Sequence, residues 1–385
     1  MQTYPARAVV DLDAIAANVR SLASGTSAEV MAVVKADGYG HGLVPAARAA
    51  RRGGATWLGT AQVSEALELR AEGDTGRVLA WLFAPGAPLS EAVQADVDLA
   101  VAAPWAVEAL VAAAREAGRT ARVHLKVDSG LGRNGVMPSQ LPEVLDALMR
   151  AQAEEALAVV GVFSHFAFAD APEHPTVLAQ AEEFARAVEL VERAGARLEV
   201  RHLANSAATL TNPAVHLDLV RPGIAVYGLS PIPEIKSSAE LGLTPAMTLE
   251  AELATVKPVP AGQGLSYAHH YVTAEDTLVG VVPLGYSDGI PRHCSGQDGR
   301  LGAPVRVGGR TLGIAGRVCM DQFVVDLGPG ASEQAGDRVE LFGTGGEGGP
   351  TAEDWARAGG TISYEIVTRL GSRVPRHYVG EGAEE

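Results

Sequence analysis

Short apolar runs typical of β-strands alternate with helix-like segments up to about residue 230. Pro104, for example, can start a helix that places Leu110, Val111 and Ala114 on one face. Eight strand–helix units in a row predict an α/β fold with a parallel (β/α)8 TIM-type barrel, while a doubly wound open sheet stays open as an alternative. We expect the strands near residues 30–34, 57–60, 78–82, 97–101, 123–127, 159–163, 198–203 and 217–220.

A second domain is expected, because 385 residues exceed the size at which one core usually stops growing. Pro231, Pro233 and a polar stretch through Glu240 predict a linker. Beyond it, only Thr351 to Arg357 looks helical, and the glycines of residues 343–349 predict a surface turn. Five further runs predict a mainly β domain: Leu249 to Val256, Leu278 to Val282, Val305 to Val307, Phe323 to Leu327 and Arg338 to Phe342.

These patterns divide the chain into a barrel of residues 11–235 and a C-terminal mainly β domain of residues 236–385. A short strand near Val9-Val10, within residues 1–10, is expected to join the β-domain. Asp13 is expected to cap the first helix of the barrel.

Composition narrows the partners and the compartment. The chain has 31 basic and 46 acidic residues, so its net charge of -15 repels phosphodiester backbones and nucleic acid is not expected to bind. Cys294 and Cys319 are too few for a disulfide framework, which suits a reducing compartment. Residues 1–5 lack the pattern of a signal peptide, and no stretch has the length of a membrane span. We expect a cytoplasmic protein without membrane contact.

Polar residues gather where the predicted strands end. Lys35, Lys126, His165, Asn205 and Arg221 each stand at, or a few residues after, the C-terminal end of a strand. In a closed barrel these ends meet on one face, where catalytic groups sit. The sequence therefore predicts a catalytic site there.

Lys35 follows the apolar run Val30 to Val34 and precedes three glycines interleaved with Tyr39 and His41. Burial at a strand end lowers a lysine pKa and frees the amine for Schiff-base chemistry, and glycines let a backbone approach a ligand closely. The alternative is a strand that ends in a solvated lysine and a turn.

Eight motifs stand in order along the chain: Val33 to Gly42, Lys126 to Arg133, Ser164 to Ala167, Asn205 to Ala208, Arg221 to Ile224, Leu265 to Tyr267, Gly316 to Asp321 and Thr361 to Glu365. Together they resemble the alanine racemase family, whose members bind pyridoxal 5'-phosphate. One departure is visible, since family members often have Asn-Ala where this chain has Asp37-Gly38.

The resemblance implies interconversion of L-alanine and D-alanine, which supplies D-alanine for peptidoglycan. Lys35 would hold the cofactor through a Schiff base and act as a base on one face of the substrate Cα, and Tyr267 would act on the other. The unperturbed tyrosine pKa of about 10 is high for a base, and a chain from Tyr267 through His165 to Arg221 would lower it. A tyrosine packed on the β-domain is the alternative for Tyr267.

Arg221 would face the pyridine nitrogen of the cofactor. A guanidinium cannot accept a hydrogen bond, so the nitrogen would stay unprotonated and side reactions such as transamination would be limited. Pairing with Asp218 is the alternative for Arg221. Ser206, the backbone amides of Gly223 and Ile224, and the hydroxyls of Tyr39 and Tyr364 would hold the phosphate, supported by Asn205.

The resemblance also implies a substrate site and a homodimer. Arg133 and the backbone amide of Met320 would bind the substrate carboxylate, and no metal is implied. Lys126 would be carbamylated, the alternative being an ordinary lysine paired with Asp128. A head-to-tail homodimer would share its active sites, because Lys35 and Tyr267 lie in different predicted domains.

Two other functions stay open at this point. A pyridoxal-dependent decarboxylase on a related scaffold would have a carboxylate near the pyridine nitrogen, where Arg221 is expected. A non-catalytic pyridoxal carrier would need only the barrel. A racemase of another small amino acid, such as serine, is a third reading.

Overall fold

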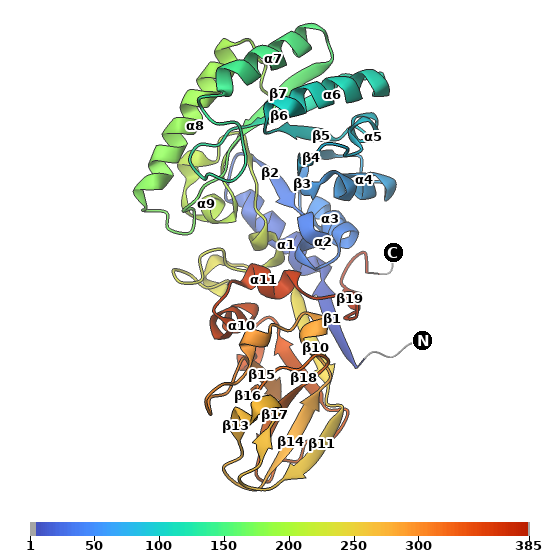
Figure 1. Cartoon of the computed structure of the whole chain (residues 1–385), viewed down its shortest axis with the longest axis vertical. Helices are drawn as coiled ribbons and strands as arrows, with labels where there is room; N and C mark the ends of the chain where they lie inside the picture. Colours follow the sequence, from blue (N-terminus) through green and yellow to red (C-terminus); the bar gives the residue numbers. More distant parts are fainter. Residues whose placement is uncertain (1–4, 384–385) are drawn as a thin grey trace.

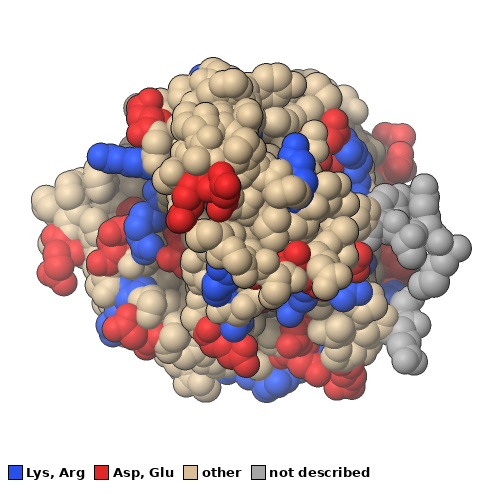
Figure 2. All heavy atoms as spheres, turned by 90° about the horizontal axis from the view of Figure 1, so that it is seen from below, with Lys and Arg blue, Asp and Glu red and all other residues tan. Residues whose placement is uncertain are grey.

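The computed structural model describes residues 5–383 and contains a barrel joined to a β-domain (Figure 1). Residues 1–4 and 384–385 lie outside the described part, and with them most of the N-terminal segment considered for a targeting signal. No helix among the described residues combines the length and the apolar character needed to cross a membrane. Acidic and basic side chains are interspersed on the face seen in Figure 2.

The eight expected strands of the first domain are confirmed. Neighbouring strands pair in parallel in the order β8-β7-β6-β5-β4-β3-β2-β9. The apolar runs form strands here because both faces of a parallel barrel sheet are buried. The strands are β2 (Glu29–Val33), β3 (Trp57–Gln62), β4 (Arg77–Leu82), β5 (Asp98–Val101), β6 (Ala121–Lys126), β7 (Leu157–Phe163), β8 (Val200–His202) and β9 (Leu219–Val220).

The two edge strands of this sheet, β8 and β9, meet at a short seam. Asn205 and Arg221 form a parallel bridge, and the Arg221 N–H donates to the Ala204 carbonyl over 2.9 Å. A second bond runs from the Asp218 N–H to the Arg201 carbonyl over 3.2 Å. The sheet is therefore a nearly closed barrel, and the doubly wound alternative is wrong.

Helices cover the outside of the barrel between successive strands (Figure 1). The predicted helix at Pro104 is confirmed with Pro104 in its first turn. The first helix begins at Leu12 and Asp11 caps it by accepting from the N–H groups of Asp13 and Ala14, so the cap predicted at Asp13 is wrong by two residues. The helices are α1 (Leu12–Ser24), α3 (Leu43–Arg52), α4 (Val63–Ala71), α5 (Leu89–Gln94), α6 (Pro104–Ala117), α7 (Leu141–Ala153), α8 (Pro175–Arg193) and α9 (Ser206–Thr211).

The second domain is mainly β, and its larger sheet has the order β16-β15-β18-β10-β1-β19. In it, β1 (Ala6–Asp11) pairs with β10 and with β19 (Arg376–Val379), so the first and the last strand of the described chain lie side by side. A three-stranded sheet, β11-β14-β17, and the pair β12-β13 complete the domain. The other strands are β10 (Met247–Glu252), β11 (Thr255–Val259), β12 (Gly264–Leu265), β13 (Tyr271–Val272), β14 (Thr277–Val282), β15 (Pro304–Val307), β16 (Arg310–Gly313), β17 (Phe323–Gly328) and β18 (Arg338–Phe342).

Three details of the second domain differ from the sequence-based expectation. The run Leu249 to Val256 is divided between β10 and β11, which belong to different sheets. A second helix, α11 (Ser363–Thr368), follows the predicted one, α10 (Ala352–Gly359). The segment expected as a linker, which begins at Pro231, is tied to the second domain at Ser238, whose hydroxyl donates to the Glu353 carboxylate over 2.9 Å.

Candidate active site

A cavity of about 840 Å³ lies at the C-terminal ends of the barrel strands. Eleven of the side chains or backbone positions predicted from the sequence line it, so the structure brings most of the predicted site together. They are Lys35, Tyr39, Lys126, Arg133, His165, Asn205, Ser206, Arg221, Gly223, Ile224 and Tyr364.

A left-handed turn follows Lys35. Ala36, Asp37, Gly38 and Tyr39 all have φ between 54° and 58°. Residues with a Cβ rarely adopt this backbone conformation, because it costs them roughly 1–2 kcal/mol each. The turn is held in place because the Asp37 carboxylate accepts from the Leu43 N–H over 2.8 Å. The departure Asp37-Gly38 thus suits the local backbone, since Asp and Gly are among the residues that tolerate it best.

The glycines after Lys35 approach protein rather than a ligand, contrary to the expectation. A Cβ on Gly40 would lie 2.3 Å from the Val367 carbonyl oxygen, and one on Gly42 would lie 2.1 Å from the Tyr378 hydroxyl. These contacts fasten the turn to the C-terminal segment. Close packing with α11 is therefore what requires Gly40.

Lys35 lies beside the cavity with its ammonium 6.0 Å from the centre of the Trp81 ring. Burial lowers the pKa of Lys35, and the charge of Arg133 lowers it further, against the opposing charge of Glu65. Glu65 also accepts from the Ala36 N–H over 2.6 Å. Burial as the largest cause of this pKa shift, together with a place in the cavity wall, disfavours the solvated-lysine alternative.

Lys126 is 6% exposed and its Nζ lies 4.6 Å from the centre of the Phe163 ring. Burial lowers its pKa to about 7, helped by the charges of Arg221 and Arg133. Among residues 5–383, no carboxylate makes an ion pair with it. The Asp128 side chain instead accepts from three N–H groups of the loop at 130–132. Pairing of Lys126 with Asp128 is therefore not seen.

Arg221 points into the barrel interior. Its Nη2 donates to the Ser164 carbonyl over 2.6 Å and lies 3.5 Å from Nδ1 of His165, while its Nη1 donates to His202 over 3.1 Å. Burial lowers its pKa to about 9, which leaves the guanidinium charged at neutral pH. Asp218 pairs with Arg201 over 2.9 Å, so the alternative pairing of Arg221 with Asp218 is wrong.

A cradle of donors forms where α9 begins. The Ser206 hydroxyl accepts from the Gly223 N–H over 2.7 Å and from the Ala225 N–H over 3.4 Å, which leaves its own hydrogen for an acceptor in the cavity. A Cβ on Gly223 would lie 2.3 Å from the Tyr39 hydroxyl, so only glycine fits there. Asn205 caps α9 by accepting from the Ala208 N–H over 3.1 Å.

Tyr364 reaches the cavity from the second domain. It lies on α11, which packs on the turn after Lys35, and its ring centre is 6.1 Å from that of Tyr39. Burial raises the pKa of Tyr364 to about 12 and raises that of Tyr39 further. Both hydroxyls therefore keep their protons and can donate hydrogen bonds into the cavity.

Tyr267 and Met320 are not brought to this cavity. They are 69% and 54% exposed on the second domain and do not line it. The residues that flank Tyr267, Ser266 and Ala268, have φ of 61° and 60°, so a strained turn presents the tyrosine to solvent. The alternative of Tyr267 packed on the β-domain is wrong.

Two family models match the chain. The one described as "Alanine racemase, N-terminal domain" covers residues 10–231, and the one described as "Alanine racemase, C-terminal domain" covers residues 246–378.

The chain belongs to the alanine racemase family.

Curated relatives and solved structures agree with this membership. The alanine racemase of Beutenbergia cavernae is 62% identical over 379 residues, which cover 98% of this chain and 99% of the relative. The crystal structure of the alanine racemase from Streptomyces lavendulae superposes with a TM-score of 0.96 at 54% identity, covering 99% of this chain and 98% of that one. The alanine racemase of Streptomyces coelicolor A3(2) gives 0.95 at 55% identity, over 98% of both chains.

Several residues in or beside the cavity were not predicted from the sequence. Trp81, Asn134 and Phe163 also line the cavity, Glu65 accepts from the Ala36 N–H next to Lys35, and His202 accepts from Arg221. His202 is the last residue of β8. A polar residue at the C-terminal end of a barrel strand indicates a site residue, so this position could have been predicted. Glu65 gives no such signal, because it lies on a helix and reaches the Ala36 N–H only through the fold.

Proposed function

We propose that this chain interconverts L-alanine and D-alanine with pyridoxal 5'-phosphate as cofactor, and thereby supplies D-alanine for peptidoglycan. The observation that carries the proposal is the single cavity that holds a desolvated amine, a donor-only guanidinium and an anion cradle. The relative at 62% identity carries the same activity in its name.

The residues present fit this cofactor. A phosphate dianion needs several donors, and the Ser206 hydroxyl, the Ile224 amide and the hydroxyls of Tyr39 and Tyr364 stand together along the cavity. The Gly223 amide, whose hydrogen is bonded to the Ser206 hydroxyl, would join them by sharing that hydrogen. Asn205 supports them as the cap of α9. Arg221 offers only donors to a ring nitrogen, so that nitrogen would have to be unprotonated. When bound, the cofactor withdraws electrons from the substrate Cα and so makes its proton removable.

Two proton-transfer groups are needed, because racemisation removes a proton from one face of the Cα and returns it on the other. Lys35 Nζ serves one face, and its lowered pKa makes the neutral amine more available. The Tyr267 hydroxyl serves the other face, with His165 and Arg221 behind it. Arg133 and the Met320 amide orient the substrate carboxylate, and Arg133 makes no ion pair within residues 5–383.

The exposed Tyr267 and Met320 support a homodimer in which the second domain of one subunit completes the cavity of its partner. The division into residues 11–235 and 236–385 agrees with this arrangement, because the interval between the two family models contains residue 235. Two free cysteines are consistent with a reducing compartment such as the cytoplasm.

Incubation of the purified holoenzyme with L-alanine in D2O tests the reaction. Loss of optical activity together with deuterium at Cα is the expected result. Release of carbon dioxide would identify a decarboxylase, and absence of turnover would identify a carrier. The same assay with L-serine decides how strictly the enzyme selects alanine.

A further inference from the structure

Four buried polar side chains form a hydrogen-bonded chain through the barrel interior. Asp98 on β5 lies 3.1 Å from Nε2 of His124 on β6, and Nδ1 of His124 lies 2.9 Å from Nε2 of His202 on β8. Nδ1 of His202 lies 3.1 Å from Nη1 of Arg221. Arg221 is 6% exposed and the other three are 0% exposed, so water does not interrupt the chain.

The hydrogen positions along this chain follow from its two ends. Arg221 can only donate, so Nδ1 of His202 has to accept and the ring hydrogen sits on Nε2. His202 then donates to Nδ1 of His124, whose hydrogen also sits on Nε2 and points to the Asp98 carboxylate. Any other assignment, including a protonated ring or a protonated Asp98, turns one link into a contact between two donors.

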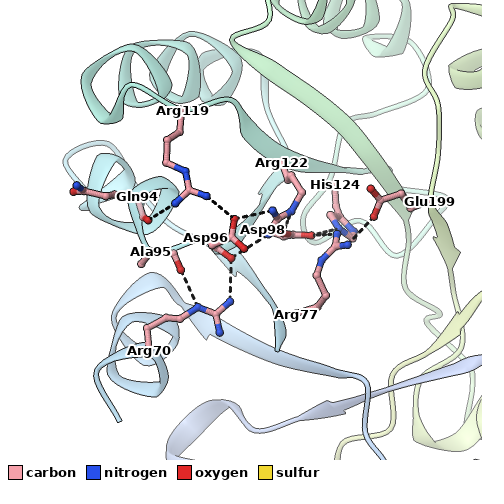
Figure 3. Close-up of polar contacts among 10 residues, drawn as sticks. All are labelled: Arg70, Arg77, Gln94, Ala95, Asp96, Asp98, Arg119, Arg122, His124 and Glu199. Carbon is pink, nitrogen blue, oxygen red and sulfur yellow. Dashed lines mark hydrogen bonds and ion pairs between the residues drawn. The ribbon is translucent and has the colours of Figure 1, made fainter. Parts of the chain in front are cut away.

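The acidic end of the chain is held ionised (Figure 3). Arg77 donates to Oδ2 of Asp98 over 2.6 Å and Arg122 donates to Oδ1 over 2.7 Å. Burial alone would raise the pKa of Asp98, but the His124 hydrogen bond and the arginine charges outweigh it and the pKa is lowered. A carboxylate locked in this way cannot exchange protons readily, so the chain sets orientation and does not conduct protons.

Nδ1 of His202 is one of a few acceptors that hold the Arg221 guanidinium in place. The Ser164 and Leu203 carbonyls accept from Nη2 over 2.6 and 3.2 Å, and Nδ1 of His202 accepts from Nη1. The Phe163 ring lies parallel to the His202 ring, 4.7 Å away, and keeps that ring in its plane. The opposite tautomer of His202 would therefore point an N–H at the cation.

We propose that Asp98, His124 and His202 are positioning residues that fix the acceptor facing Arg221 and thereby the orientation of its guanidinium in the cofactor cavity. The effect on racemisation rests on the proposed function, whereas the hydrogen positions do not. None of the three residues lines the cavity.

Neutron diffraction from perdeuterated holoenzyme tests the hydrogen positions directly. The expected result is deuterium on Nε2 and none on Nδ1 in both His124 and His202. Deuterium on Nδ1 of either ring, or on Asp98, would overturn the proposal. This result does not depend on any turnover, so it separates the failure of the positioning proposal from the failure of the proposed function.

Two variants of His202 separate positioning from packing. His202→Asn keeps an oxygen where Nδ1 stands and can still accept from Arg221, but it loses the stack on Phe163. His202→Phe keeps the stack and loses the acceptor. We expect kcat of His202→Phe to be on the order of 10- to 100-fold lower than kcat of His202→Asn, which is the range for a lost hydrogen bond to a charged group. A better-preserved kcat in His202→Phe would mean that packing alone matters.

Asp98→Asn and Asp96→Asn form a matched pair at the acidic end. Both remove a carboxylate that contacts Arg122, yet Asp96 is half exposed and touches neither histidine (Figure 3). We expect Asp98→Asn to lower kcat about tenfold or more and Asp96→Asn to leave it within about twofold. Equal losses of kcat in the two variants would overturn the positioning proposal. If Asp98→Asn does not fold, the neutron result still decides the matter.

Discussion

The hydroxyl of Ser266 lies 3.4 Å from the thiol of Cys319, and it donates to the Arg317 carbonyl over 2.8 Å. These contacts hold the segment of Tyr267 beside that of Met320. Two residues expected at one active site thus share a surface of the second domain, while Lys35 lies at the barrel cavity. Within one subunit, Tyr267 and Met320 do not line the cavity that contains Lys35. A site shared between the two subunits of a dimer is therefore the first hypothesis to test.

A mixture of Lys35→Ala and Tyr267→Phe chains should regain activity that neither variant has alone. A mixed dimer has one site that lacks both groups and one site with both intact. If the chains reassort randomly, half the dimers are mixed and about a quarter of all sites recover.

Mass tags on the two chains verify that mixed dimers form, and turnover of alanine is the measurement. Mixed dimers that stay as inactive as the parent variants would place Lys35 and Tyr267 of one site in the same chain.

Borohydride reduction of the yellow holoenzyme should fix the pyridoxyl group on Lys35. This lysine combines a lowered pKa with a place beside the anion cradle. Peptide mapping by mass spectrometry locates the label, and Lys35→Ala provides the unlabelled control. A label on Lys126 would show that the two lysines have been assigned the wrong way round.

Lys126 should carry a carbamate in the active enzyme. Its pKa of about 7 leaves much of the amine neutral at neutral pH, and only the neutral form adds carbon dioxide, with loss of one proton. The resulting anion would face the same arginines that lower the pKa. Occupancy should therefore fall as the pH drops below about 7.

A ¹³C signal after incubation with ¹³C-bicarbonate measures this modification. The signal should be absent from Lys126→Ala and present in Lys35→Ala. Fully active protein with an unmodified Lys126 by intact mass would remove the carbamate.

Gly38→Ala should lower the free energy of unfolding by about 1–2 kcal/mol, because Gly38 sits in the left-handed turn at φ 58°. The new Cβ would also lie 3.0 Å from that of Ala46. Gly25→Ala is the matched control, since Gly25 has φ of -86° and its Cβ would meet only the Leu22 and Ser21 carbonyls at 3.5 and 3.9 Å. Denaturant unfolding of both variants measures the difference. Equal stabilities would show that the turn relaxes at no cost.

Local signals predicted the barrel well. A strand of a parallel sheet is buried on both faces, so its residues form a continuous apolar run that can be read without knowing its neighbours. The same logic placed Lys35, Lys126, His165, Asn205 and Arg221 at one end of the strands, and all five line the cavity. The first helix was placed with its cap two residues late, because Asp11 and Asp13 are equally good caps in sequence.

Elements that depend on distant partners could not be predicted in this way. The strand β19 exists because it pairs with β1 at the other end of the chain, and α11 packs against the turn after Lys35. The run Leu249 to Val256 looked like one strand because periodicity does not show where a chain passes from one sheet to another.

The sequence by itself determined the barrel, the mainly β second domain and most of the cavity's polar residues, because strand burial and strand ends leave a local pattern. Tertiary structure alone decided which of these residues touch. The left-handed turn depends on packing against α11 and Tyr378, and the links from Asp98 through His124 and His202 to Arg221 join β5, β6, β8 and the end of β9. Along these hydrogen-bonded links the contacts join residues up to 78 positions apart, and a hydrogen bond across a barrel depends on strand register, which no local pattern encodes.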